Sequence, residues 1–179
     1  MKLISLLEKL EYTCLQGSTD QEVKNVIYDS RKVEEGSLFI CIRGAVVDGH
    51  KFVPDVVAKG AKVLIVEEAV EAPEDVTVIL VKDTRYAMAF ISAAYFGYPA
   101  EKLKTIGITG TKGKTTTTYM VKSILENAGY KVGLIGTIEA IIGDKVIPAK
   151  NTTPESYVIQ EYFCLSLIHI SEPTRQEAI

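Results

Sequence analysis

The segment from Leu103 to Gly136 reads LKTIGITGTKGKTTTTYMVKSILENAGYKVGLIG, and its apolar period changes twice. Residues 103–109 and 131–136 are short apolar runs that are typical of buried strands, whereas residues 114–129 have helical spacing. A strand, a helix and a second strand of these lengths predict a βαβ unit with parallel strands. Between the first strand and the helix lies a glycine-rich turn, residues 110–113.

This turn and the start of its helix form a candidate phosphate-binding loop. Its members are Gly110, Thr111, Lys112, Gly113, Lys114, Thr115 and Thr116. Backbone N–H groups at a helix start attract phosphate, the Lys114 ammonium can reach the β and γ phosphates, and the Thr115 hydroxyl can bind Mg²⁺. We therefore expect bound phosphates with Mg²⁺ at this loop, and Lys114 and Thr115 as the side chains that act on them. Ile108 replaces the first glycine of the general pattern, so the motif is a shortened variant, and a plain strand-to-helix turn is the alternative.

The sequence before this unit also alternates strands and helices. Apolar runs at 25–30, 37–42, 61–67 and 76–81 alternate with helical stretches at 51–60 and 83–97. This pattern predicts an α/β fold with a largely parallel sheet. Asp83 and Thr84 are expected to cap the helix that follows them, and Gly97 and Pro99 to end it. We expect a small N-terminal α/β domain at 1–98 and the incomplete start of a second α/β domain at 99–163.

The composition excludes several classes of function. The chain has 179 residues and a formal net charge of −3, so no basic field favours a nucleic acid or an anionic membrane. No uncharged apolar run is long enough to span a bilayer. The three cysteines, Cys14, Cys41 and Cys164, have no metal-binding spacing and are expected as reduced thiols of a cytoplasmic protein.

Several motifs occur together in one order along the chain. They are YDSR at 28–31, GSLF at 36–39, Gly44 with DGH at 48–50, TGTKGKTTT at 109–117 and NTTP at 151–154. This set resembles the Mur ligases, the ATP-dependent enzymes that build the peptide stem of peptidoglycan. NTTP favours the members that add the third residue of the stem. The resemblance covers about residues 1–163.

The resemblance implies a reaction and a set of binding residues. The implied substrates are UDP-N-acetylmuramoyl-L-alanyl-D-glutamate, ATP and a diamino acid, either meso-diaminopimelate or L-lysine. Carried over by motif, Tyr28 and Ser30 would contact the uridine diphosphate, and the loop after Gly44 would lie along the uracil. Asn151, Thr152 and Thr153 would meet the muramoyl peptide. Lys112 departs from the family, which often has Asn there.

Several points stay open at this stage. Residues 165–175, LSLIHISEPTR, resemble a translated adapter of transposase-based sequencing libraries, so we expect 164–179 to be a non-native tail. A chain that ends so early is expected to lack ligase activity, and a non-catalytic UDP- or ATP-binding module or an unrelated phosphate-loop NTPase are the alternatives. Arg31 can pair with Asp29 or meet a phosphate, and His50 is expected to form hydrogen bonds rather than to catalyse.

Overall fold

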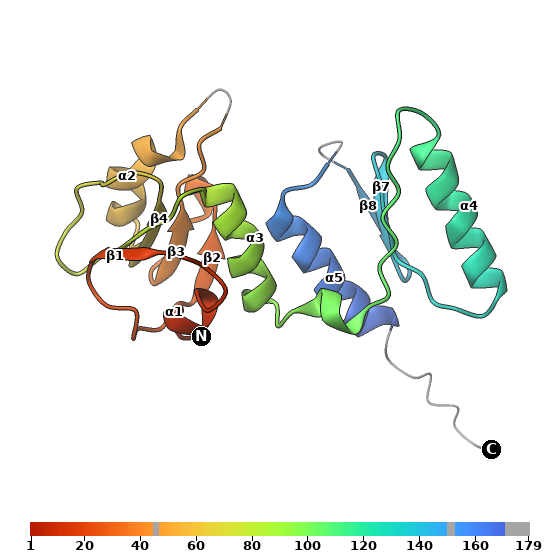
Figure 1. The fold of residues 1–179 in the computed structure, drawn as a ribbon, viewed down its shortest axis with the longest axis horizontal. Helices are drawn as coiled ribbons and strands as arrows, with labels where there is room; N and C mark the ends of the chain where they lie inside the picture. Colours follow the sequence, from red (N-terminus) through yellow and green to blue (C-terminus); the bar gives the residue numbers. More distant parts are fainter. Residues whose placement is uncertain (45–46, 150–152, 171–179) are drawn as a thin grey trace, which may run out of the picture. The chain divides into compact units, whose positions relative to one another are not determined.

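The computed structural model describes residues 1–44, 47–149 and 153–170. These residues form two compact units, Met1–Tyr95 and Phe96–Ile179, which we describe separately (Figure 1). The sequence predicts a boundary after residue 98, which is three residues later than the observed end of unit 1 at Tyr95. None of the helices in the described ranges is long and apolar enough to cross a membrane.

Unit 1 is built on one five-stranded sheet with the order β1-β5-β4-β3-β2. The strands are β1 (Thr13–Gln16), β2 (Asn25–Ile27), β3 (Ser37–Ile40), β4 (Val63–Val66) and β5 (Thr77–Leu80). Strands β2 to β5 pair in parallel, and β1 adds to β5 in the antiparallel sense. The expected α/β fold with a mainly parallel sheet is confirmed.

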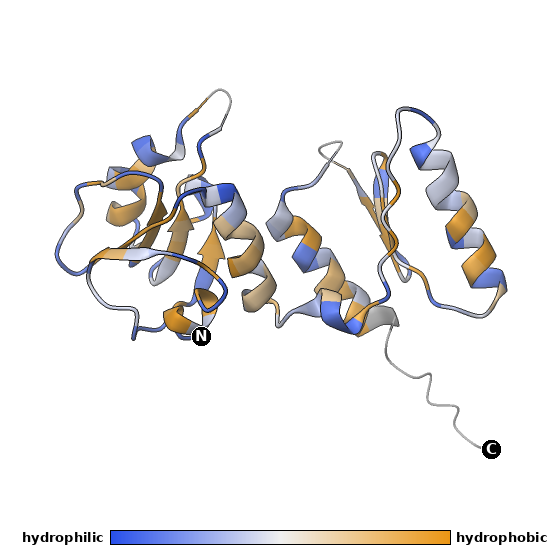
Figure 2. Cartoon of the chain, viewed as in Figure 1, coloured by the Kyte–Doolittle hydropathy of each residue, from blue (hydrophilic) through white to orange (hydrophobic). Residues whose placement is uncertain are grey.

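Both faces of this sheet are buried, which explains the continuous apolar runs of β3 and β4. The helices are α1 (Leu3–Leu6), α2 (Val53–Ala58) and α3 (Thr84–Tyr95), with 3₁₀ turns η1 (Ser30–Lys32) and η2 (Gly49–Phe52). On one face, Val56 of α2 belongs to a core cluster with Phe39 and Leu64. Leu38 and Ile65 alternate with these residues along their strands and are also fully buried. Figure 2 shows this apolar sheet in orange.

Helix α3 begins with the Asp83 cap that the sequence predicts, but Thr84 is its first residue and donates its hydroxyl to Glu67 instead of capping the helix. The Asp83 carboxylate accepts a hydrogen bond from the Tyr86 N–H at 2.9 Å, which satisfies a donor of the first helical turn. The side chain of Thr84 is fully buried. The helix ends at Tyr95, before Gly97, which has a φ of +74°.

The described residues of unit 2 form three helical segments and a separate antiparallel sheet. Its elements are η3 (Pro99–Lys102), α4 (Lys114–Asn127), β6 (Leu134–Ile135), β7 (Glu139–Ile142), β8 (Lys145–Pro148) and α5 (Ser156–Ile170). The strand order is β6-β7-β8. Gly143 has a φ of +56° in the two-residue turn between β7 and β8.

The prediction of a parallel βαβ unit at 103–136 is wrong for its two strands. Residues 103–109 join no ladder within the described parts of the chain, and only Leu134 and Ile135 of the second run form a strand. That strand, β6, pairs with the adjacent β7 in the antiparallel sense, and a hydrogen bond from Gly136 N–H to Glu139 O closes the turn at 3.0 Å. A hairpin closes a much shorter loop than a parallel crossover, so this local pairing is favoured.

Helix α5 confirms the helix expected from Glu155 to Phe163 but does not stop there. It continues through Cys164 to Ile170 and so includes the first seven residues of the expected tail. The run LSLIHI contains no glycine or proline that would end a helix. Residues 171–179 lie outside the described ranges, and the foreign origin of the tail stays a prediction.

Candidate functional site

The candidate phosphate loop leads into helix α4, as its sequence predicts. Gly113 is the N-cap of α4 with a φ of +77°, a backbone conformation that side chains with a Cβ rarely adopt. Its carbonyl accepts the Thr117 N–H at 2.9 Å. The N–H groups of the first turn have no acceptor within the helix, and the helix dipole adds positive potential there. This geometry suits an anion.

Lys114 and Thr115 occupy the first turn of α4. The Lys114 Nζ donates to the carbonyl of Gly110 at 2.5 Å, so the lysine folds back over the loop. No carboxylate pairs with Lys114 in the part of the chain that the structure describes, and its charge is not neutralised locally. Thr115 is half-buried, whereas the other loop members are exposed. They are Gly110, Thr111, Lys112, Gly113, Lys114 and Thr116.

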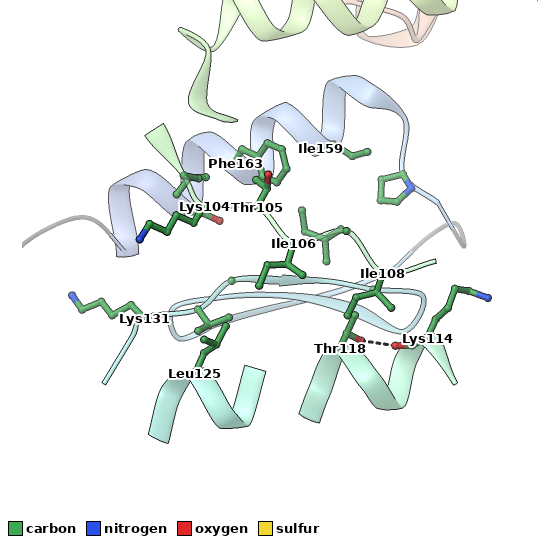
Figure 3. A pocket seen from close by; sticks show the side chains of 18 of the residues that line it. Lys104, Thr105, Ile106, Ile108, Lys114, Thr118, Leu125, Lys131, Ile159 and Phe163 are labelled. Atoms are coloured by element: carbon green, nitrogen blue, oxygen red, sulfur yellow. Dashed lines mark hydrogen bonds between the residues drawn. The ribbon is translucent and has the colours of Figure 1, made fainter. Parts of the chain in front are cut away.

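A cavity of about 940 Å³ opens beside this loop (Figure 3). Lys114, Thr115 and Thr153 all line it, so the structure brings part of the phosphate loop and one residue of the NTTP motif to one cavity. Ligand pockets have volumes of roughly 300 to 1,000 Å³. Asn151 and Thr152, the other two residues expected to meet the peptide, lie outside the described residues.

Apolar side chains form much of the cavity wall. Ile106 and Ile108 come from the segment before the loop, Leu125 from α4, and Ile159 and Phe163 from α5 (Figure 3). The cavity therefore combines a cationic, hydroxyl-bearing end with an apolar body. The Lys114 ammonium, the Thr115 hydroxyl and the N-terminal N–H groups of α4 fit the phosphates of ATP and one ligand of a Mg²⁺ ion.

The second candidate site lies in unit 1, where Tyr28, Asp29 and Ser30 follow β2. The Asp29 carboxylate accepts the Arg31 N–H at 3.1 Å and so caps the η1 turn. The Ser30 carbonyl accepts a hydrogen bond from the Lys59 Nζ at 2.8 Å. Ser30 is half-buried, and its hydroxyl forms no hydrogen bond within the described residues. This hydroxyl is available to a ligand.

Arg31 pairs with Asp29, which resolves the alternative left open by the sequence. Its Nε and Nη2 donate to the two carboxylate oxygens at 2.9 and 2.8 Å. These hydrogen bonds, opposed by partial burial, lower the pKa of Asp29 to about 2. Ligands of open α/β sheets bind at the carboxyl ends of parallel strands, and the turn follows such an end.

The ends of β3 and β4 carry polar residues that the sequence analysis did not select. Arg43 donates to Asp48 at 3.2 Å and to Glu68 at 2.9 Å. Glu67 accepts two hydrogen bonds from Thr84, from its N–H at 2.8 Å and from its hydroxyl at 2.7 Å. Glu67 comes directly after β4, and Arg43 lies three residues after the end of β3. This position at the carboxyl ends of buried parallel strands was the signal that could have identified them.

Comparisons with known proteins agree with this arrangement. The model of the Mur ligase family catalytic domain matches residues 22–96, and that of the Mur ligase middle domain matches residues 108–166. The UDP-N-acetylmuramoyl-L-alanyl-D-glutamate--2,6-diaminopimelate ligase of Clostridium perfringens (strain 13 / Type A) is 53% identical over 163 residues, which are 91% of this chain and 34% of that enzyme.

Solved structures show the same fold. A structure of a UDP-N-acetylmuramoyl-L-alanyl-D-glutamate--2,6-diaminopimelate ligase gives a TM-score of 0.71 at 21% identity, over 96% of this chain and 34% of that one. The structure of the MurF ligase of Thermotoga maritima in complex with ADP gives a TM-score of 0.51 at 22% identity. The match covers 79% of this chain and 29% of that one. The chain thus spans about a third of the length of these relatives. The two matched segments include both candidate sites, and the chain belongs to the Mur ligase family.

Proposed function

We propose that this chain is part of an ATP-dependent ligase that joins 2,6-diaminopimelate to UDP-N-acetylmuramoyl-L-alanyl-D-glutamate in peptidoglycan synthesis. The observation that carries the proposal is the identity of 53% to a ligase of that name across 163 residues, which extends over both units. The names of the relatives favour diaminopimelate over lysine as the added residue. Because the reaction consumes ATP, we place it in the cytoplasm.

The reaction is the formation of an amide bond in two steps. The γ-phosphoryl group of ATP moves to a carboxylate oxygen of the substrate, and ADP leaves. The amine of the diamino acid then attacks the carbonyl carbon, inorganic phosphate leaves, and the amine loses a proton. The chain's own contribution is electrostatic: the Lys114 ammonium and the N–H groups of the first turn of α4 neutralise charge on the transferred group. Mg²⁺, held in part by the Thr115 hydroxyl, would supply further positive charge at the phosphates.

Unit 1 holds the uridine diphosphate end of the substrate in this proposal. Ser30 offers an unpaired hydroxyl after β2, and Tyr28 lies two residues before it. Thr153 lines the same cavity as Lys114, which supports a contact between Thr153 and the muramoyl peptide.

The test is a titration of the 179-residue chain with UDP-N-acetylmuramoyl-L-alanyl-D-glutamate, followed by amide NMR signals. We expect the signals of Tyr28 and Ser30 to shift, and Ser30→Ala to weaken binding about tenfold, since a lost hydrogen bond costs about 1 kcal/mol or more. Ser5→Ala, at an exposed position of α1, is the matched control. A chain that binds Mg-ATP but not the UDP ligand would contradict the ligase proposal.

A further inference from the structure

His50 is a buried polar residue to which the proposed reaction gives no role. It lies in η2, the 3₁₀ turn between β3 and α2, and its side chain is 5% exposed. A buried imidazole needs partners for both ring nitrogens. The structure supplies two partners that come from different parts of unit 1.

The hydrogen bonds fix which nitrogen of His50 carries the proton. The backbone N–H of Glu67 points at Nε2 at 3.0 Å, and because this group can only donate, Nε2 must accept. The proton of the neutral ring is therefore on Nδ1, which donates to Asp48 Oδ1 at 2.6 Å. The same oxygen accepts the His50 N–H at 3.0 Å. Hydrogen bonds from His50 lower the pKa of Asp48, so the carboxylate stays ionised.

Asp48 in turn holds the residues next to it in the turn after β3, and we call Gly44 and Val47 the ends of this loop. Its other oxygen accepts from the Arg43 Nε at 3.2 Å, and the two residues also form a backbone bridge. Within that bridge, the Gly44 N–H donates to Val47 O at 3.0 Å. On the other side of Arg43 and Asp48 in the sequence, the Gly49 N–H donates to Ile42 O at 2.8 Å. Gly49 packs so closely there that a Cβ would lie 2.7 Å from Ile42 N.

The contacts that hold this loop differ in strength. The Arg43 side chain is 48% exposed, and exposed ion pairs contribute little. The bond between His50 and Asp48 is short, charge-assisted and partly buried, which makes it the stronger constraint. His50 is anchored through Glu67, whose carboxylate binds the start of α3 at Thr84.

We propose that His50 is a positioning residue: through Asp48 it holds Arg43, Gly44 and Val47 in place after the carboxyl end of β3, where we expect the uridine end of the substrate to bind. The part that concerns the ligand rests on the proposed function. The part that concerns the loop stands on the geometry alone, and the two are measured separately.

Two substitutions test the roles of the two ring nitrogens of His50 separately. His50→Asn places an amide donor where Nδ1 stands and keeps the bond to Asp48, but it leaves Glu67 N–H without its acceptor. His50→Gln reaches the position of Nε2 and can accept from Glu67 N–H, but it has no donor at Asp48. Thr84→Val removes a hydroxyl from the same set of hydrogen bonds on the α3 side and is the matched control.

The first readout is amide hydrogen exchange at Gly44 in the 179-residue chain without ligand. We expect exchange about tenfold faster in His50→Gln, and near the wild-type rate in His50→Asn and Thr84→Val. An unchanged rate in His50→Gln overturns the proposal. Equal acceleration in both His50 variants overturns it as well, because His50 would then act only as a core residue.

The second readout is affinity for UDP-N-acetylmuramoyl-L-alanyl-D-glutamate. We expect a loss of about tenfold in His50→Gln that His50→Asn largely restores, since the lost bond involves a charged group. If the wild-type chain does not bind this ligand, the proposed function fails, while the exchange rates still decide the role of His50 in the loop. If His50→Gln accelerates exchange but binds as the wild type does, the ligand does not depend on the positions of Gly44 and Val47, and the positioning role in binding is wrong.

Discussion

Lys114 is the residue of unit 2 that we expect to contribute most to the binding of ATP. Its ammonium contacts only the Gly110 carbonyl among the bonds described, so a phosphate can replace that carbonyl without breaking an ion pair. We predict that Lys114→Met weakens binding of Mg-ATP by roughly tenfold to a hundredfold, because hydrogen bonds to charged groups contribute about 1.5–3 kcal/mol. Calorimetric titration of the 179-residue chain measures this.

The control for that experiment lies in the same loop. Lys112 has the same charge and is exposed, but it precedes the helix. Lys112→Met should weaken binding much less than Lys114→Met. Equal losses would show that the loop attracts ATP through its total charge, and the specific role of Lys114 would be wrong.

The pairing of Asp29 with Arg31 predicts a dependence of stability on pH. The pKa of Asp29 is lowered from 3.8 to about 2, so the folded state favours the ionised carboxylate. This contribution is present above about pH 4 and is lost as the pH falls towards 2. Because Arg31 is 86% exposed, we expect a loss of about 1 kcal/mol or less. Urea unfolding at several pH values, followed by amide signals of β3, should show a shallower acid dependence in Asp29→Asn.

At the scale of elements, strand β4 is the central support of unit 1. Leu64 is fully buried and belongs to the core cluster shared with α2. We predict that Leu64→Ala lowers the free energy of unfolding of unit 1 by about 2–5 kcal/mol, since the cavity only partly collapses. Leu15→Ala in β1, where the side chain is 44% exposed, should change it by less than about 0.5 kcal/mol. Similar losses in both variants would contradict the assignment of the core.

The elements that sequence predicts well are those set by local signals. The continuous apolar runs of β3 and β4 can only be buried on both faces, and glycine at 113 with threonines after it indicates the start of α4. The segment 103–109 has the same apolar character as a strand, but pairing depends on which partner is nearest in space. Strand β6 pairs with the neighbouring strand β7 instead of with residues 103–109. The apolar periodicity of the sequence does not indicate which of these partners is chosen.

The candidate sites divide in the same way. The phosphate loop is contiguous in sequence, so its residues could be selected without a structure. His50, Glu67 and Thr84 are joined by hydrogen bonds across 17 residues in each step, which only the fold brings together. Their sequence neighbours give no indication of this contact.

At the scale of the whole molecule, the two units differ in how much of their chain is buried. Helix α4 has no buried residue, and Ile106 is 64% exposed in a segment without a ladder partner in the described ranges. Unit 1 buries every residue of β3 and β4. We predict that trypsin cleaves first at Lys102, Lys104 or Lys112 and leaves unit 1 intact, as mass spectrometry of a brief digest would show. Early cleavage within unit 1 would contradict this order of stability.

The resemblance of residues 165–175 to a library adapter predicts a property of the gene. Genomic DNA that never passed through a transposase library, sequenced across the codons for Phe163 and Cys164, should show a reading frame that departs from the printed one after residue 163. A frame that encodes LSLIHISEPTR would establish these residues as native, and the seven that α5 adds after Phe163 would then be a natural part of that helix.

Cys41 lies at the end of β3 with its side chain fully buried, and burial raises the pKa of its thiol to about 12. A thiol reagent attacks the thiolate and needs access to the sulfur, so Cys41 is protected twice while unit 1 is folded. Cys14 is exposed and offers a second thiol in the same unit for comparison. The rate at which Cys41 is alkylated, relative to that of Cys14, therefore reports how often unit 1 unfolds. The chain thus contains its own chemical probe of unfolding.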